Sequence, residues 1–240
     1  MLFDIYPTLR TYNRPDNMLA ERKIVILAPH PDDEVIGCGG TIHMYHLKKA
    51  DITAVFLTDG RKGNERYKEE ELVVIRREEA KKAAAIIGIN RLIFMDNRDS
   101  ELSHSSKAFS ELTSILNEIK PGAVFLPFFM DSHPDHSAAN LILYKSERLL
   151  PSFMCYAYPV WTPLPFFNLN VDITPYVDIK KKSIEQYQSQ METYNYIDAS
   201  LGLSRYYSIH EGNRKGDDWS EVLFVCKSTE YMRVLKAAGW

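Results

Sequence analysis

Residues 24–34 read IVILAPHPDDE, an apolar run that passes directly into a polar one. Ile24 to Ala28 has the length and the β-branched content of a buried strand. The acids Asp32, Asp33 and Glu34 are typical of a helix start, because aspartate caps helices and carboxylates stabilise the first turn. A strand that passes straight into a helix is the repeating unit of an α/β fold.

The same alternation continues along the chain. Further strands are predicted at Ile52 to Thr58, Leu92 to Met95 and Val124 to Pro127. Helices are predicted between them at Val35 to Lys48, Glu69 to Ile87 (with Gly88 as its stop) and Lys107 to Ile119. Because strands that alternate with helices form right-handed βαβ units, we expect a Rossmann-like, mostly parallel sheet with helices on both faces.

The pattern becomes less regular after about residue 150. We expect strands at Phe153 to Tyr158, Asn170 to Ile173 and Val222 to Lys227, and one helix at Asp178 to Tyr194. We find no internal repeat or linker, so residues 1–240 are expected to form a single domain. Its core would span about residues 23–190, and a C-terminal extension would complete the site.

The composition excludes several classes of protein. The 45% hydrophobic and 25% charged fractions are ordinary for a globular domain, and the net charge of −3 gives no reason to expect nucleic acid or a membrane as partner. Three scattered cysteines without a CxxC pair argue for a reducing compartment and against a thiolate zinc site. Met1 to Met18 has no apolar run, so we expect no signal peptide and a cytoplasmic location.

A second cluster of histidines and acids follows the strand predicted at Val124 to Pro127. Residues 131–136 read DSHPDH. Ligands bind at the carboxyl ends of the strands in doubly wound sheets, and in the usual order 3-2-1-4 the first and fourth strands are neighbours. The two clusters should therefore face one crevice. Each alone is explained by helix capping, but two at equivalent strand ends indicate a metal site.

The residue types suit a catalytic metal. His30, Asp33 and His136 would provide two imidazoles and one carboxylate and leave a fourth position for water, as catalytic zinc sites do. Ferrous iron accepts the same ligands, so the residues alone leave the ion undecided.

Three further residues of the two clusters suit metal-assisted hydrolysis. Asp32 can take a proton from water, and His133 can stabilise a developing oxyanion. Asp135 can hold His133 in its productive tautomer.

The two clusters resemble the signatures of the LmbE-like, or PIG-L, family of N-acetylglucosaminyl deacetylases. The first signature is Ala-His-Pro-Asp-Asp-Glu, and here Pro29 stands between Ala28 and His30. The second, His-x-Asp-His, is matched by residues 133–136. Weaker matches at residues 58–63, 76–80 and 178–190 extend the resemblance over most of residues 23–190.

The resemblance implies the LmbE-like deacetylase fold, with zinc on His30, Asp33 and His136, Asp32 as general base and His133 as electrostatic stabiliser. It also implies that Arg76 and Asp99 contact the sugar, because relatives contact it from the matching positions. For Arg76, an ion pair with Glu78 or Glu79 on the helix surface is an alternative.

We therefore expect a zinc-dependent N-deacetylase, a hydrolase of linear amide bonds. It would remove acetyl from an N-acetylglucosamine-type sugar or small conjugate and release acetate and a free amine.

Homo-oligomers are common among the resembling proteins, and Tyr156 to Phe167 is a candidate interface. Arg61 to Glu71 and Pro159 to Phe167 are candidate lids. The sequence does not identify the sugar, and the tail Tyr206 to Asp218 is a candidate for substrate preference.

Two other classes are alternatives. A nucleotide-binding sugar oxidoreductase or epimerase would use Gly37-Cys38-Gly39-Gly40, with Asp59 near the ribose, but G-x-G-x-x-G requires glycine at Ile42. The acids before these glycines would also repel a pyrophosphate. Close packing of the first helix on the sheet is a simpler role for the glycines. The other alternative is a non-catalytic metal- or sugar-binding module on the same fold, although such a module has no need of a base such as Asp32.

Overall fold

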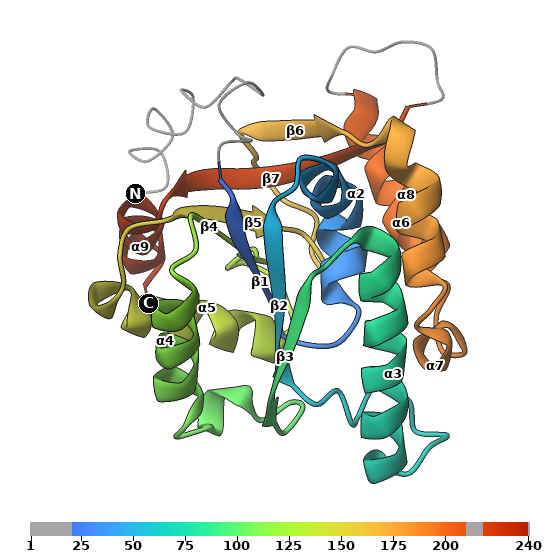
Figure 1. The fold of residues 1–240 in the computed structure, drawn as a ribbon, viewed down its shortest axis with the longest axis horizontal. Coiled ribbons are helices and arrows are strands. Elements are labelled where there is room, and N and C mark those ends of the chain that lie inside the picture. Colours follow the sequence, from blue (N-terminus) through green and yellow to red (C-terminus); the bar gives the residue numbers. More distant parts are fainter. Residues whose placement is uncertain (1–20, 210–217, 240) are drawn as a thin grey trace.

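The computed structural model describes residues 21–209 and 218–239. In this part of the chain a seven-stranded sheet has the order β3-β2-β1-β4-β5-β7-β6 (Figure 1). The strands are β1 (Lys23–Ala28), β2 (Asp51–Thr58), β3 (Arg91–Asn97), β4 (Ala123–Pro127), β5 (Met154–Tyr158), β6 (Leu169–Asp172) and β7 (Ser220–Lys227). Strands β1 to β5 are parallel, and β7 is antiparallel to both of its neighbours. The predicted mostly parallel sheet and the order 3-2-1-4 are confirmed.

Helices cover both faces of this sheet. They are α2 (Asp33–Leu47), α3 (Glu69–Ile87), α4 (Ala108–Ile119), α5 (Pro134–Ser146), α6 (Val177–Ile184), α7 (Gln188–Met191), α8 (Tyr196–Ser208) and α9 (Ser228–Ala237). In β1, Val25 and Leu27 pack into a core with α4, α5 and α9, whereas Ile24 and Ile26 pack into a second core with α2, α3 and α6. A strand buried on both faces explains the continuous apolar run.

The helix predicted at Asp178 to Tyr194 is wrong in its extent. The chain forms α6, leaves the helix, and then forms the short α7. The break lies at Tyr187, which has φ −83° and ψ 58° and whose buried hydroxyl donates a hydrogen bond to Glu34 Oε1 at 2.5 Å. The tertiary contact of Tyr187 thus replaces the regular helix. By contrast, α3 has the predicted bounds, and Gly88 ends it in the left-handed conformation at φ +87°.

The glycines of α2 pack against neighbouring elements. A Cβ at Gly37 would overlap the Tyr158 ring, and one at Gly40 would lie 2.7 Å from Ile173 Cγ2. The helix also kinks between them, at Cys38, which has φ −147° and ψ 23°. The packing role predicted for these glycines is confirmed.

The C-terminal segment is part of the sheet, not an addition to a core that ends near residue 190. Strand β7 lies between β5 and β6 and hydrogen-bonds to both.

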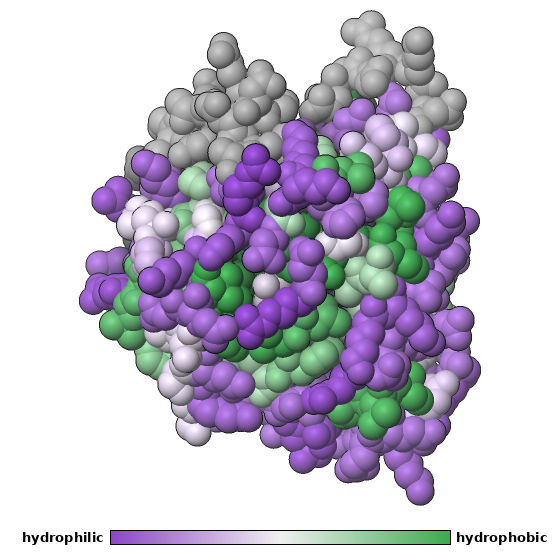
Figure 2. Space-filling model, viewed as in Figure 1, coloured by the Kyte–Doolittle hydropathy of each residue, from purple (hydrophilic) through white to green (hydrophobic). Residues whose placement is uncertain are grey.

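Figure 2 shows apolar side chains over the edge strand β3, beside the polar surface of α3. Within the described residues, no helix has the length and apolar character needed to cross a membrane.

Candidate metal centre

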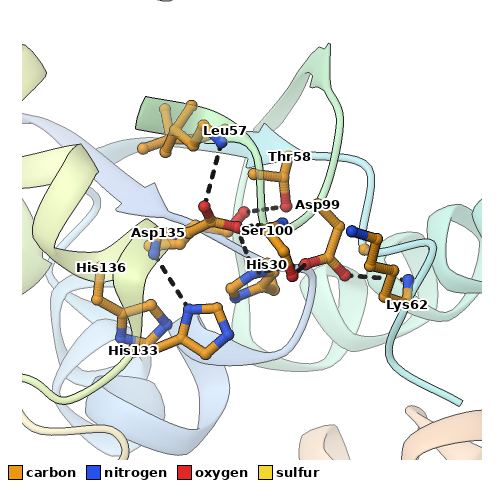
Figure 3. A network of polar contacts seen from close by, with 12 residues as sticks. His30, Leu57, Thr58, Lys62, Asp99, Ser100, His133, Asp135 and His136 are labelled. Carbon is orange, nitrogen blue, oxygen red and sulfur yellow. Dashed lines mark hydrogen bonds and ion pairs between the residues drawn. The ribbon is translucent and has the colours of Figure 1, made fainter. Parts of the chain in front are cut away.

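The two histidine clusters meet because β1 and β4 are neighbours in the sheet. His30 and Asp33 lie at the junction of β1 and α2. His133 and His136 lie at the start of α5, and Figure 3 shows these two rings near that of His30. The ring centroids of His30 and His136 are 5.5 Å apart, and that of His133 is 4.6 Å from His30 and 5.0 Å from His136. The expectation that both clusters face one crevice is confirmed.

The carboxylate of Asp33 lies between the two predicted histidine ligands. Asp33 Oδ2 lies 3.3 Å from His30 Nδ1 and 3.2 Å from His136 Nε2. The backbone N–H of His30 fixes this carboxylate by donating to Oδ2 at 2.8 Å. His136 Nε2 is buried and has no hydrogen-bond partner among the described residues, although Asp33 is close. These residue types suit a divalent cation. Among the described residues, two groups have ligand atoms that all lie within 4.8 Å of one another: His30, His133 and His136, and His30, Asp99 and Asp135. Asp33 belongs to neither group.

A carboxylate stands behind each of the two histidines. Asp131 Oδ1 lies 3.2 Å from His136 Nδ1, and Asp135 Oδ2 lies 3.2 Å from His30 Nε2. Asp99 Oδ1 also lies 3.3 Å from His30 Nε2. Carboxylates in these positions orient metal-binding imidazoles and raise their basicity. Sequence reasoning missed Asp131, although it begins the DSHPDH cluster.

The predicted role of Asp135 needs correction. Its carboxylate faces His30 and accepts the backbone N–H of Ser100 at 2.7 Å, and does not contact His133 (Figure 3). Its own backbone N–H donates to His133 Nδ1 at 3.2 Å, so that His133 is the N-cap of α5. Because Nδ1 is the acceptor, the proton of neutral His133 is on Nε2. The helix start therefore fixes the tautomer of His133, and the carboxylate of Asp135 orients His30.

The electrostatics of the centre favour a bound cation. Burial lowers the pKa of His136, but Asp33 and Asp131 outweigh it and raise the pKa to about 9. Burial likewise lowers the pKa of His30, and its carboxylate partners, Asp135 first, raise it well above the usual value. The imidazoles hold protons here because buried carboxylates surround them. A divalent cation would supply the same positive charge in place of those protons.

Asp32 lies beside the three ligands in a strained backbone conformation. Its φ is +132°, and its backbone N–H donates to Glu34 Oε2 at 3.0 Å. Its carboxylate pairs with Arg76 at 2.9 Å. Burial raises the pKa of Asp32 to about 7, while Arg76 opposes that rise. A carboxylate with a pKa near neutrality is suited to accept and return a proton.

Arg76 is buried in the wall of the pocket. Its side chain is 3% exposed, and it donates hydrogen bonds to the carbonyls of Gly60 and Pro31 as well as pairing with Asp32. The alternative of an ion pair on the helix surface is therefore wrong. Asp99, the other predicted substrate contact, lines the same pocket and accepts the backbone N–H of Lys62 at 3.1 Å.

The pocket over the centre has a volume of about 630 Å³. His30, Asp32, Asp33, Arg76, Asp99 and His133 line it, while Asp135 and His136 are buried behind them. Residues 62–66 and Trp161, from the two predicted lids, also line it. Sequence reasoning missed Gln190, Glu192 and Tyr196, which the break in the late helix brings to the pocket. Of the tail Tyr206 to Asp218, residues 210–217 lie outside the described part of the chain.

Comparison with known proteins gives consistent matches. The model of the family PIG-L, described as GlcNAc-PI de-N-acetylase, matches residues 25–145. The diacetylchitobiose deacetylase of Thermococcus kodakarensis is 28% identical over 198 residues, which are 74% of this chain and 73% of that protein. A probable N-acetyl-alpha-D-glucosaminyl L-malate deacetylase 2 of Bacillus anthracis is 30% identical over 198 residues, 73% of this chain and 84% of the relative.

A solved structure shares the whole architecture. The N,N'-diacetylchitobiose deacetylase of Pyrococcus horikoshii superposes with a TM-score of 0.79 at 26% sequence identity. The match covers 96% of this chain and 94% of that one, so it includes the C-terminal elements for which the sequence pattern was least regular.

Proposed function

Because this chain belongs to the PIG-L, or LmbE-like, family, we propose that it is a metal-dependent hydrolase that removes the N-acetyl group of an N-acetylglucosamine-type sugar. The contacts of Asp33 Oδ2 with His30 Nδ1 and His136 Nε2 carry this proposal, because these atoms would be the donors of a three-ligand site. Asp32 and His133 line the pocket beside them, and together they provide a proton acceptor and a hydrogen-bond donor.

The likeness to the deacetylase family, and not the donor set, favours zinc. His30, Asp33 and His136 would hold the ion, which when bound would activate water and polarise the acyl carbonyl as a Lewis acid. The three cysteines are buried and free, and no described group of clustered metal ligands includes one of them. Ferrous iron is the competing ion, because it takes the same nitrogen and oxygen ligands.

The chain's own residues supply the proton transfers. Asp32 accepts the proton of the attacking water, and Arg76 keeps its carboxylate in place. His133 donates its Nε2 proton as a hydrogen bond to the oxyanion that develops on the acyl carbon. Burial and the neighbouring charge of His30 lower the pKa of His133, so the residue is neutral and serves as a donor without becoming an imidazolium. Asp32 then returns its proton to the leaving amine.

The sugar would lie against the wall formed by Arg76 and Asp99. Asp99 has an acceptor-only carboxylate at the pocket surface, and hydroxyl groups of a sugar are suitable donors to it. Acetate and a free amino sugar would be the products.

The test is acetate release from N-acetylglucosamine, N,N'-diacetylchitobiose and N-acetylglucosaminyl malate by metal-stripped protein, with and without added zinc or ferrous iron. We expect no release without metal and recovery with one equivalent of ion per chain. Release that is unaffected by stripping would contradict the metal role, and no release from any substrate by protein that has bound metal would contradict the deacetylase assignment.

A further inference from the structure

A second cavity adjoins the catalytic pocket, and we call it the annex. It has a volume of about 270 Å³ and lies between α2, α8, β7 and residues 159–161. Both cavities are lined by Ile36, Val160, Trp161, Tyr194 and Tyr196. The annex and the catalytic pocket are therefore neighbours that share part of their walls.

One face of α8 forms a wall of the annex. The residues of α8 that line it are Tyr196, Ala199, Ser200, Leu203, Ser204 and Tyr207. Their spacing of three and four residues places them in one stripe along the helix. The three smallest, Ala199, Ser200 and Ser204, lie in the middle of that stripe. These small side chains leave space on this face of the helix.

The charged groups of the annex wall are already paired with each other. Lys180 Nζ lies 2.7 Å from Glu221 Oε1 and donates to the carbonyl of Ile36 at 2.9 Å. Glu221 also accepts the backbone N–H groups of Gly40 and Thr41 at 2.9 and 2.7 Å. These two side chains are each 1% exposed. A ligand charge would find no unpaired counter-charge on this wall, so the annex favours an uncharged, apolar occupant.

The annex opens within reach of the metal centre. Ile36 lines both cavities and is one helical turn from Asp33, about 4.5 Å along the axis at ~1.5 Å per residue. Trp161 and Tyr194 flank the shared boundary and are 48% and 61% exposed. The ring centroid of Tyr196 is 5.9 Å from each of theirs. Three aromatic rings at such a boundary provide an apolar contact surface for a ligand that enters both cavities.

We propose that the annex binds an uncharged apolar substituent of the substrate while the amide lies at the metal centre. The substituent is either the N-acyl chain or the group attached to the sugar as aglycone. This inference rests on the proposed function, because it places a substrate amide beside Asp33. It predicts that substrates with an alkyl or aryl extension are preferred to N-acetylglucosamine itself.

Two substrate series identify which substituent the annex receives. The first lengthens the acyl group from N-acetyl to N-butanoyl and N-hexanoyl glucosamine. The second keeps N-acetyl and lengthens the aglycone from methyl to butyl and phenyl glycosides. In one series kcat/KM should rise by up to about fourfold for each buried methylene, until the annex is filled. No rise in either series would overturn the proposal.

A variant whose side chain fills the annex is the structural control. Ala199 lines the annex at an exposed position, so Ala199→Phe should fold and occupy the cavity. This variant should lose the rise with chain length. Gly202→Phe adds the same side chain to the same helix where a Cβ meets nothing within 4 Å, and it should keep the rise. An equal rise in both variants would show that the extension binds elsewhere.

Measuring the affinity of the protein for these substrates tests this inference separately from the proposed function. Calorimetric titration of metal-loaded Asp32→Asn protein with both series measures binding without turnover. A rise in affinity with chain length that Ala199→Phe removes supports the annex even if no acetate is released by the wild type. A flat affinity series beside normal acetate release would overturn the annex and leave the deacetylase assignment intact.

Discussion

At the scale of single residues, His30 is the side chain on which the contacts of the site converge. Its Nδ1 faces the ligand oxygen of Asp33, while its Nε2 faces Asp99 and Asp135. The ring is therefore held on both nitrogens by carboxylates. These contacts fix the orientation of the ring, so that the ring is preorganised for the proposed cation.

Replacing the proposed base tests its role directly. Asp32→Asn keeps the size of the side chain but removes its ability to accept a proton. We expect kcat to fall by about 10²- to 10⁴-fold, the usual contribution of a general base. Metal content should stay at one ion per chain, because Asp32 is outside the ligand set. Turnover close to that of the wild type would contradict the assignment.

The carboxylates behind the histidines should act on metal affinity. Asp131→Asn and Asp135→Asn each replace a carboxylate that faces a proposed ligand histidine by a neutral amide, so we expect metal to bind about 10- to 100-fold more weakly. Asp96→Asn, at an exposed aspartate, is the matched control and should leave affinity unchanged. The measurement is competition with a chromophoric chelator. Unchanged affinity in Asp135→Asn would contradict the orienting role of this carboxylate.

At the scale of elements, the kink in α2 separates the part that carries the site from the part that packs on the sheet. The helix departs from regular geometry at Cys38. Lys180 and Ser200 donate to the carbonyl of Ile36 just before the kink, and Glu221 accepts two N–H groups just after it. Groups from α6, α8 and β7 thus satisfy the backbone that the kink leaves unpaired.

The buried pair that holds this kink should be strongly coupled. Lys180→Met or Glu221→Gln alone leaves a buried partner unpaired, and we expect each to lower the free energy of unfolding by about 3–5 kcal/mol. The double variant should lose less than the sum of the two. Lys181→Met, at an exposed position of the same helix, is the control. Urea unfolding measures all four variants, and additive losses would show that the pair does not act as a unit.

At the scale of the whole molecule, the site unites segments that are far apart in the sequence. The proposed metal ligands follow the ends of β1 and β4, and the far wall of the pocket comes from residues 190–196. The sheet is completed by β7, which the chain adds last and inserts between β5 and β6. We propose on this ground that the described chain folds as one domain whose C-terminal part is indispensable. The predicted homo-oligomer remains a prediction.

Metal removal should destabilise the whole fold. A cation that binds only the folded chain stabilises it by about 4 kcal/mol when present at about 1,000 times its dissociation constant. Because the centre ties α2 to α5 across the sheet, we expect a chelator to lower the melting temperature and added zinc to restore it. Protein with His136→Ala should melt at the same temperature with and without zinc. A chelator effect that persists in this variant would place the ion elsewhere.

The sequence by itself determined the parallel sheet, its order near the site and the meeting of the two histidine clusters. Apolar periodicity is a local signal, and the rule that ligands bind at strand ends converts it into proximity. Only the tertiary structure decided that Asp135 faces His30, that Tyr187 breaks the late helix and that Arg76 is buried against Asp32. These outcomes depend on which side chains of distant segments satisfy one another's hydrogen bonds and charges once buried. Packing in three dimensions decides which of these hydrogen bonds and ion pairs form, and no local sequence pattern indicates them.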